Sequence, residues 1–267
     1  MNWKKKLLNT PVVGDITKKI AAVKISYDAH NISKHFIQYL QPEVATTPAL
    51  KEEVFRIRHD VYCTELKFEP PRANEMETDD FDDQSLFALI KHKPSGNYAS
   101  CVRIVTSSSN DELLPIEKYC GESIEHDEFN PSLFKREEIC EISRLAVRPD
   151  FRRRRTDKFA GSATGAIEES TYSESELRCF PFIAIGLYMA GASLALKAGK
   201  KHAYVMMEPR LARSMRFVGI KFVQIGKPIE YHGLRAPYYI NAEIFLENLT
   251  AGFKSLYKEI QKDIDGD

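Results

Sequence analysis

The chain has 267 residues, of which 43% are hydrophobic and 28% are charged, a composition typical of a globular protein with a sizeable core. Lysine and arginine total 38, as do aspartate and glutamate, so no overall charge excess holds the chain on a polyanion. The 5 cysteines include no Cys-x-x-Cys pair, which excludes a zinc ribbon and argues against a disulfide framework. We therefore expect a cytoplasmic protein.

Residues 1–47 are basic and amphipathic, with Ile16, Ile20 and Val23 at helical spacing among lysines. Polar residues and Pro11 interrupt the start, so we expect no signal peptide. The pattern predicts a helical leader. Such a leader suits peripheral contact with anionic lipid or an acidic carrier protein, but a helix packed on the domain is the simpler interpretation.

The apolar stretch 180–199 is long enough for a membrane span of roughly 20 residues. Strand-like residues follow it at once, which favours a buried helix. Thr47 and Pro48 are typical of a helix start, and apolar spacing extends this helix to about Leu66. The other expected elements are strands at 85–92 and 97–106 that form a hairpin, a strand at 138–148, a helical region at 159–170, a strand at 202–207, a helix at 209–218, strands near 221–225 and 237–240, and a C-terminal helix at about 243–260.

This order of elements predicts a mixed α/β (α+β) fold. The sequence contains no internal repeat and no low-complexity linker. We therefore expect one domain at 48–240, with the leader (1–47) before it and a C-terminal helical segment (241–267) after it.

Six acidic residues lie just ahead of the expected hairpin: Glu75, Glu77, Asp79, Asp80, Asp82 and Asp83. They lack the glycine and glutamate positions of an EF-hand loop, so we expect no metal site. Asp80 and Asp83 are typical of a solvated loop. Glu77, Asp79 and Asp82 precede or follow arginines in ordered segments, where unpaired charges would be costly, and we expect an ion-pair network with Arg58, Arg103 and Arg144. The network is either structural or presents charges to a small amine substrate.

Glu141 and Arg144 lie three residues apart in an expected strand. Side chains at this spacing point to opposite faces of a regular strand, so either one turns away from the core or a bulge intervenes. A bulge is plausible at an active site.

A run of four arginines follows this strand and precedes an expected helix: Arg152, Arg153, Arg154 and Arg155. We interpret the run as an anion site that holds the phosphate of a carrier's pantetheine arm. A nucleic-acid patch and a solvated loop are the alternatives, but interleaved aromatic residues and a nucleic-acid motif are lacking.

The charged motifs, in chain order, are Arg58-x-x-Val61-Tyr62, Glu77-x-Asp79-x-x-Asp82, Arg103 and Glu141-x-Ser143-Arg144. They resemble the signature of the acyl-homoserine-lactone autoinducer synthases and the related N-acyl amino acid synthases, which are GNAT-fold acyltransferases. The second half contains Arg144-Leu145-Ala146-Val147 leading into the arginine run, Met206-Met207-Glu208-Pro209-Arg210-Leu211-Ala212-Arg213, and Glu230-Tyr231-His232-Gly233-Leu234-Arg235. These stretches resemble the exosortase (PEP-CTERM) system-associated acyltransferases most closely.

The resemblance implies a GNAT-type mixed central sheet flanked by helices. It also implies transfer of an acyl group, expected to be long-chain, from a thioester to the amine of an amino acid or related small molecule. Glu141 is the implied base, with Ser143 and Arg144 as its catalytic partners. The implied acceptor-binding residues are Arg58, Tyr62, Glu77, Asp79, Asp82 and Arg103. The arginine run replaces the glycine loop that wraps coenzyme A in other GNAT enzymes, which favours an acyl carrier protein as donor and no bound cofactor.

Three alternatives stay open. S-adenosylmethionine as acceptor would make the chain an acyl-homoserine-lactone synthase. A module that binds nucleic acid or a membrane surface through the arginine run belongs to a different class. An inactive interaction protein would use the charged motifs for structure alone.

Overall fold

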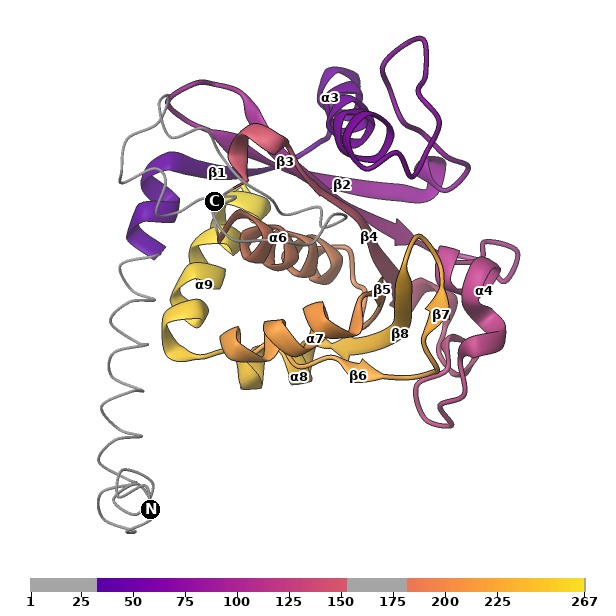
Figure 1. Cartoon of the computed structure of the whole chain (residues 1–267). Helices are drawn as coiled ribbons and strands as arrows, with labels where there is room; N and C mark the ends of the chain where they lie inside the picture. Colours follow the sequence, from indigo (N-terminus) through magenta and orange to yellow (C-terminus); the bar gives the residue numbers. More distant parts are fainter. Residues whose placement is uncertain (1–32, 153–181, 267) are drawn as a thin grey trace, which may run out of the picture.

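The computed structural model describes residues 33–152 and 182–266, which form a mixed sheet with helices on both faces (Figure 1). The strand order is β1-β2-β3-β4-β5-β8-β6, with β7 paired to β8. All pairs are antiparallel except β4 with β5. The strands are β1 (Leu40–Val44), β2 (Ser85–His92), β3 (Tyr98–Thr106), β4 (Ile139–Val147), β5 (His202–Met207), β6 (Val223–Gln224), β7 (Ile229–Glu230) and β8 (Leu234–Asn241). The expected mixed α/β fold is confirmed.

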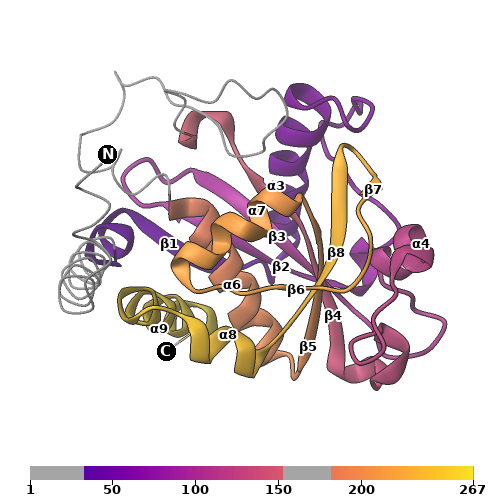
Figure 2. The same ribbon diagram turned by 60° about the horizontal axis from the view of Figure 1, so that its bottom comes forward.

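Helices cover the two faces unequally. They are α3 (Pro48–Arg58), α4 (Pro115–Cys120), α6 (Ile183–Lys197), α7 (Pro209–Met215), α8 (Ala242–Asn248) and α9 (Ala251–Asp265). Helix α3 lies on one face, whereas α6 and α9 lie on the other (Figures 1 and 2). Strand β3 shows the division: Cys101 packs in the cluster under α3, Val105 in the cluster under α4, and Val102 and Ile104 in the cluster under α6. Alternation along β3 therefore places α3 and α4 on the same face.

The helix expected from Thr47 to about Leu66 is confirmed, with a change of winding in its middle. The Thr47 hydroxyl accepts a hydrogen bond from the Leu50 amide and caps α3. From His59 to Glu65 the chain continues as a π-helix. The wider turn is a feature that is frequent at functional sites.

The apolar stretch after residue 182 is a buried helix, as we expected. Helix α6 packs between the sheet and α9, and most of its side chains are buried. In the part of the chain that the structure describes, no helix is both long and apolar enough to cross a membrane.

The sheet begins before residue 48, where we expected the domain to start, because the last residues of the expected leader belong to it. Residues 33–39 are helical, and Leu40–Val44 forms β1, which pairs with β2. Phe36 packs in the main core, where a Cβ on Gly186 would lie 2.5 Å from its ring. The glycine thus permits this segment to approach α6 closely.

Two helices replace the single C-terminal helix that we expected. Helices α8 and α9 are separated at Leu249 and Thr250, both of which have extended backbone conformations. Buried Leu249 packs in the main core, so tertiary packing favours the break. Helix α9 then lies along α6.

Candidate active site

Strands β4 and β5 separate at the centre of the sheet. They pair only where Ile139 to Glu141 lies beside His202 to Tyr204. Beyond Glu141, the edge of β4 that faces β5 has no strand partner in the described part of the chain. This separation leaves backbone groups available beside a carboxyl group.

A bulge brings Glu141 and Arg144 to the same side of β4. The register between β3 and β4 shifts after Cys101, and Arg144 has a left-handed backbone with φ of 50°. This conformation costs a non-glycine residue about 1 kcal/mol, so the surrounding contacts must stabilise it. The bulge that the spacing of Glu141 and Arg144 suggested is therefore present.

Both residues line one cavity of about 220 Å³. The predicted site residues that line it are Tyr62, Glu77, Asp79, Arg103, Glu141, Ser143 and Arg144. Arg58 and Asp82 do not line it. Arg58 is 0% exposed, so it lies behind the wall and does not contact an acceptor directly as we had expected.

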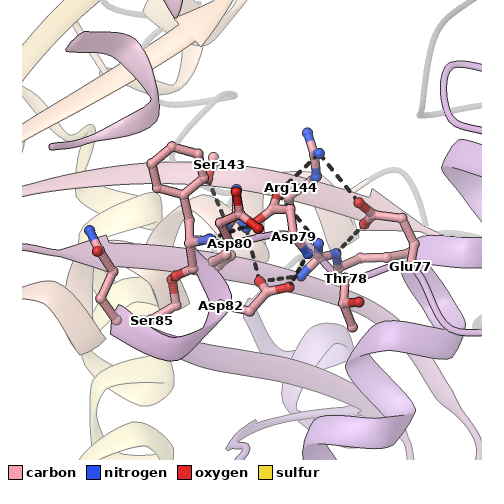
Figure 3. Close-up of polar contacts among 12 residues, drawn as sticks. Glu77, Thr78, Asp79, Asp80, Asp82, Ser85, Ser143 and Arg144 are labelled. Carbon is pink, nitrogen blue, oxygen red and sulfur yellow. Dashed lines mark hydrogen bonds and ion pairs between the residues drawn. The ribbon is translucent and has the colours of Figure 1, made fainter. Parts of the chain in front are cut away.

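The expected ion-pair network is present behind and along this wall (Figure 3). Arg58 donates to Glu77 and to Asp82, at 2.6 Å from Nη1 to Oδ1 of Asp82. Arg103 donates to Asp79 and, at 2.9 Å, to Asp82. Asp82 thus bridges the two buried arginines.

Arg144 completes the network from the bulge. Its Nη2 lies 3.2 Å from an Asp79 oxygen and 3.3 Å from oxygens of Glu77 and Glu69. Burial alone would raise the pKa of Glu77, but the charges of Arg58 and Arg144 outweigh it and lower this pKa. Glu77 therefore stays ionised at neutral pH.

Glu141 has the opposite electrostatic environment. Its carboxyl accepts a 2.6 Å hydrogen bond from the Ile116 amide at the start of α4. Burial raises its pKa to about 7, although this hydrogen bond and the charges of Arg103 and Arg144 act in the other direction. A carboxyl with this pKa exchanges a proton readily near neutral pH.

Two other predicted residues hold the bulge in place. The Tyr62 hydroxyl donates to the Leu145 carbonyl at 2.9 Å, and the Tyr62 ring lies under the Arg144 guanidinium, 5.5 Å from its centroid. Ser143 accepts a hydrogen bond of 3.2 Å from Arg103 Nε. Tyr62 therefore holds the backbone just after Arg144, and Ser143 joins the residue before it to Arg103.

The structure corrects the expectation for the first arginine of the run. Arg152 is buried and forms an ion pair with Glu65 at the end of the π-helix, so its guanidinium does not face a carrier as we had expected. The other three members, Arg153, Arg154 and Arg155, lie outside the described residues, as does the helical region expected at 159–170. The four arginines therefore do not act as one uniform phosphate site.

Two residues of the acidic loop, Asp80 and Asp83, are exposed to solvent, as we expected. The side chain of Asp80 is 95% exposed. No group of three or more His, Cys, Asp or Glu residues in the described ranges could hold a metal ion.

Most of the residues that line the cavity were not predicted from the sequence. The residues missed are Phe68, Glu69, Arg72, Tyr119, Tyr231, His232 and Arg235, among others. Tyr231 stacks with Tyr119, and His232 stacks with Phe68. The motif at 230–235 is visible in the sequence, but its place beside Glu141 depends on the pairing of distant segments.

The comparisons agree with this geometry. Residues 57–161 match the model of the acetyltransferase (GNAT) domain. No curated protein matches the chain by sequence. The match, the fold and the site define the class of protein: the chain is an acyltransferase of the GNAT fold.

Three solved structures are similar to this chain. TofI, in a ternary complex with an inhibitor and MTA, is 18% identical with a TM-score of 0.55, over 81% of this chain and 99% of that chain. The CoA-dependent acyl-homoserine lactone synthase BjaI, with SAM and isopentyl-CoA, is 17% identical with a TM-score of 0.54, over 83% of this chain and 89% of that chain. FeeM, an N-acyl amino acid synthase from uncultured soil microbes, is 11% identical with a TM-score of 0.49, over 79% and 94%. At these identities the first two establish the fold that they share with this chain.

Proposed function

We propose that the chain is an N-acyltransferase that moves an acyl group, long-chain by our expectation, from an acyl carrier protein thioester to the amine of an amino acid or related small molecule. Glu141 carries this proposal. It is a buried carboxyl with a pKa of about 7 on the wall of a polar cavity, beside a strand edge without a partner in the described chain. An amine must lose a proton to attack a thioester, and this carboxyl is suited to take it.

The proposed reaction is direct. The amine nitrogen attacks the thioester carbonyl carbon, and Glu141 takes the nitrogen's proton, either directly or through a water molecule. Backbone amides of β4 beyond Glu141 stabilise the oxyanion. The carbon–sulfur bond then breaks, and the leaving thiolate takes up a proton. Ser143 supports the site, because its hydroxyl accepts from Arg103 and keeps its own hydrogen for donation.

Cysteine chemistry is not needed in this scheme. Cys120 lines the cavity but is buried, and burial raises the pKa of its thiol to about 11. A thiol with this pKa carries little thiolate at neutral pH and is a poor nucleophile.

An exposed basic surface supports a carrier protein as donor. Helix α7 begins two residues after β5, at the separating strands, and exposes Arg213. The next turn exposes Arg216 and Phe217, and Phe217 is 83% exposed. Positive charge beside an apolar side chain suits an acidic protein with an apolar contact.

The finer parts of the proposal rest on the sequence motifs. They support the exosortase-associated branch, while the cysteine pattern supports a cytoplasmic location and the basic, amphipathic pattern of the leader supports a peripheral membrane contact. The motifs also support a phosphate site for the carrier's pantetheine arm, now restricted to Arg153, Arg154 and Arg155. We expect no nucleic acid partner.

A second candidate is acyl-homoserine-lactone synthesis from S-adenosylmethionine. BjaI, which has the same fold, is a CoA-dependent acyl-homoserine lactone synthase whose structure contains SAM and isopentyl-CoA. Both the acceptor and the donor of this chain therefore need a direct test.

The test supplies acyl carrier protein thioesters or acyl-CoA thioesters of several chain lengths, together with amino acids or S-adenosylmethionine. Mass spectrometry then identifies the products. Linear acyl amino acids made faster from the carrier thioester would support the proposal, and lactones would favour the second candidate. The absence of any acylated amine with either donor would overturn both.

A further inference from the structure

Two charged groups on the buried part of the cavity wall have no ion-pair partner within residues 33–152 and 182–266. One is the carboxyl of Glu141, and the other is the guanidinium of Arg235. Arg72 also lines the cavity, but it is exposed and donates to the Thr78 carbonyl. Arg103 and Arg144 are held by the acidic loop. In the described part of the chain, the buried wall therefore presents to a ligand one carboxyl and one guanidinium that no opposite charge neutralises.

Arg235 is placed on the same face of the sheet as Glu141. It lies on β8 four residues before Tyr239, which packs in the cluster that also holds Ile139 of β4. Ile139 and Glu141 share a face because they are two residues apart on a strand, and the same alternation applies from Tyr239 to Arg235. Arg235 stands beyond the end of β5, since its neighbour on β8, residue 236, is the one that pairs with the last residue of β5.

The orphaned nitrogen of Arg235 points to a ligand. Its Nε is buried and makes no hydrogen bond within the described chain, although the side chain lines the cavity. A buried donor without an acceptor costs about 1–3 kcal/mol, more when it is charged. Binding of an anionic group would remove this cost.

The hairpin that carries Arg235 is fixed at its tip. Tyr231 stacks on Tyr119 of α4 at 5.9 Å between ring centroids, and His232 stacks on Phe68 at 5.2 Å. The positive charge of Arg235 acts to lower the pKa of the Tyr62 hydroxyl and of the Cys120 thiol, which also line the cavity, although burial outweighs it and raises both pKa values. Arg235 is thus presented by an anchored element to the interior of the site.

We propose that Arg235 binds the carboxylate of the acceptor, so that the acceptor is an α-amino acid held with its amine toward Glu141 and its carboxylate toward Arg235. This inference rests on the proposed function and adds a recognition residue to it. This class of acceptor includes both free amino acids and S-adenosylmethionine. The mass of the product shows which of the two was acylated. Arg235 binds substrate in this scheme and takes no part in proton transfer.

The experiment compares a mixture of amino acids with the matching mixture of their α-amides, using an acyl carrier protein thioester as donor. The wild-type protein should prefer the amino acids. Arg235→Met should raise KM for amino acids about 10- to 100-fold with little change in kcat, since a charged hydrogen bond is lost. Rates with the amides should stay unchanged. Arg235→Lys should restore part of the loss, and Arg56→Gln, on the exposed face of α3, should behave as wild type.

Equal loss with amino acids and amides would overturn the inference, because Arg235 would then act on the thioester or on the fold. An unchanged KM in Arg235→Met would also overturn it. If no amine is acylated, the proposed function fails but the inference is still tested by saturation-transfer NMR with the same two mixtures. Binding of amino acids that is lost in Arg235→Met and kept in Arg56→Gln would support the carboxylate site, and binding that Arg235→Met retains would refute it.

Discussion

Replacing Glu141 by glutamine tests the base directly. The amide oxygen can still accept the hydrogen bond from the Ile116 amide, so the variant keeps the size and the contact of the carboxyl but cannot take a proton. A positioned base contributes typically about 10²- to 10⁴-fold to a rate, so single-turnover acylation should fall by this factor. The assay uses saturating thioester and acceptor, with rapid quenching and product detection by mass.

The pH profile sharpens this prediction. With a pKa of about 7, Glu141 is only about one-tenth ionised at pH 6 and about nine-tenths ionised at pH 8. The wild-type rate should therefore rise toward pH 7 and level off above it. The ionisation of the acceptor amine is common to both proteins, so the difference between their profiles isolates Glu141. An unchanged rate and profile in Glu141→Gln would refute the reasoning.

Stability gives an independent readout of the same group. The pKa rises from 4.5 in the unfolded chain to about 7 in the folded protein, so the folded state binds this proton more tightly. The stabilising contribution is fully present below pH 4.5 and is lost as the pH rises through about 7, a difference of about 3 kcal/mol. Urea unfolding should show Glu141→Gln gaining stability relative to wild type by up to this amount at pH 8. The exposed control Glu137→Gln should show no such trend.

Three further substitutions test the supporting structure. Arg58→Met should cost about 3–5 kcal/mol in urea unfolding, because it leaves buried carboxylates without their partner; a loss below about 1 kcal/mol would contradict the network. Gly219→Ala should cost about 2 kcal/mol or more by the same measurement, since φ is +92° and the new Cβ would lie 2.1 Å from the Asn248 carbonyl oxygen. Asp79→Asn should move the midpoint of the pH–rate profile below about 7, because its arginines would then act more strongly on Glu141; a midpoint that stays in place would show that the network does not set the base.

The sequence predicts those features that depend on neighbours in the chain. The helix start at Thr47 follows from a capping residue before proline, and the spacing of Glu141 and Arg144 made a bulge one of two alternatives, which the structure decides. The arginine–acid network was also predictable, because a buried guanidinium needs an anion and the acidic loop was the nearest dense source.

The features that were predicted wrongly or not at all depend on contacts between residues far apart in the sequence. Arg152 belongs to a run that we interpreted as an anion site, yet it is buried against Glu65, which lies on an element far upstream. Arg235 carries no local signal for its role, since only the pairing of β8 with β5 places it beyond the end of β5. Sheet pairing and burial of this kind are set by the whole fold, which periodicity and caps do not report.

The network explains why Glu141 keeps a raised pKa although two arginines stand beside it. Unpaired, Arg103 and Arg144 would hold a nearby carboxyl ionised far below neutral pH. Asp79 pairs with both arginines, and Asp82 and Glu77 each pair with one of them, so most of the positive charge is compensated before it acts on Glu141. Burial of Glu141 is then the largest effect on its pKa, and it raises that pKa. The acidic loop thus sets the strength of the base as well as the position of the arginines, which is why it must fold over the site before the site can work near neutral pH.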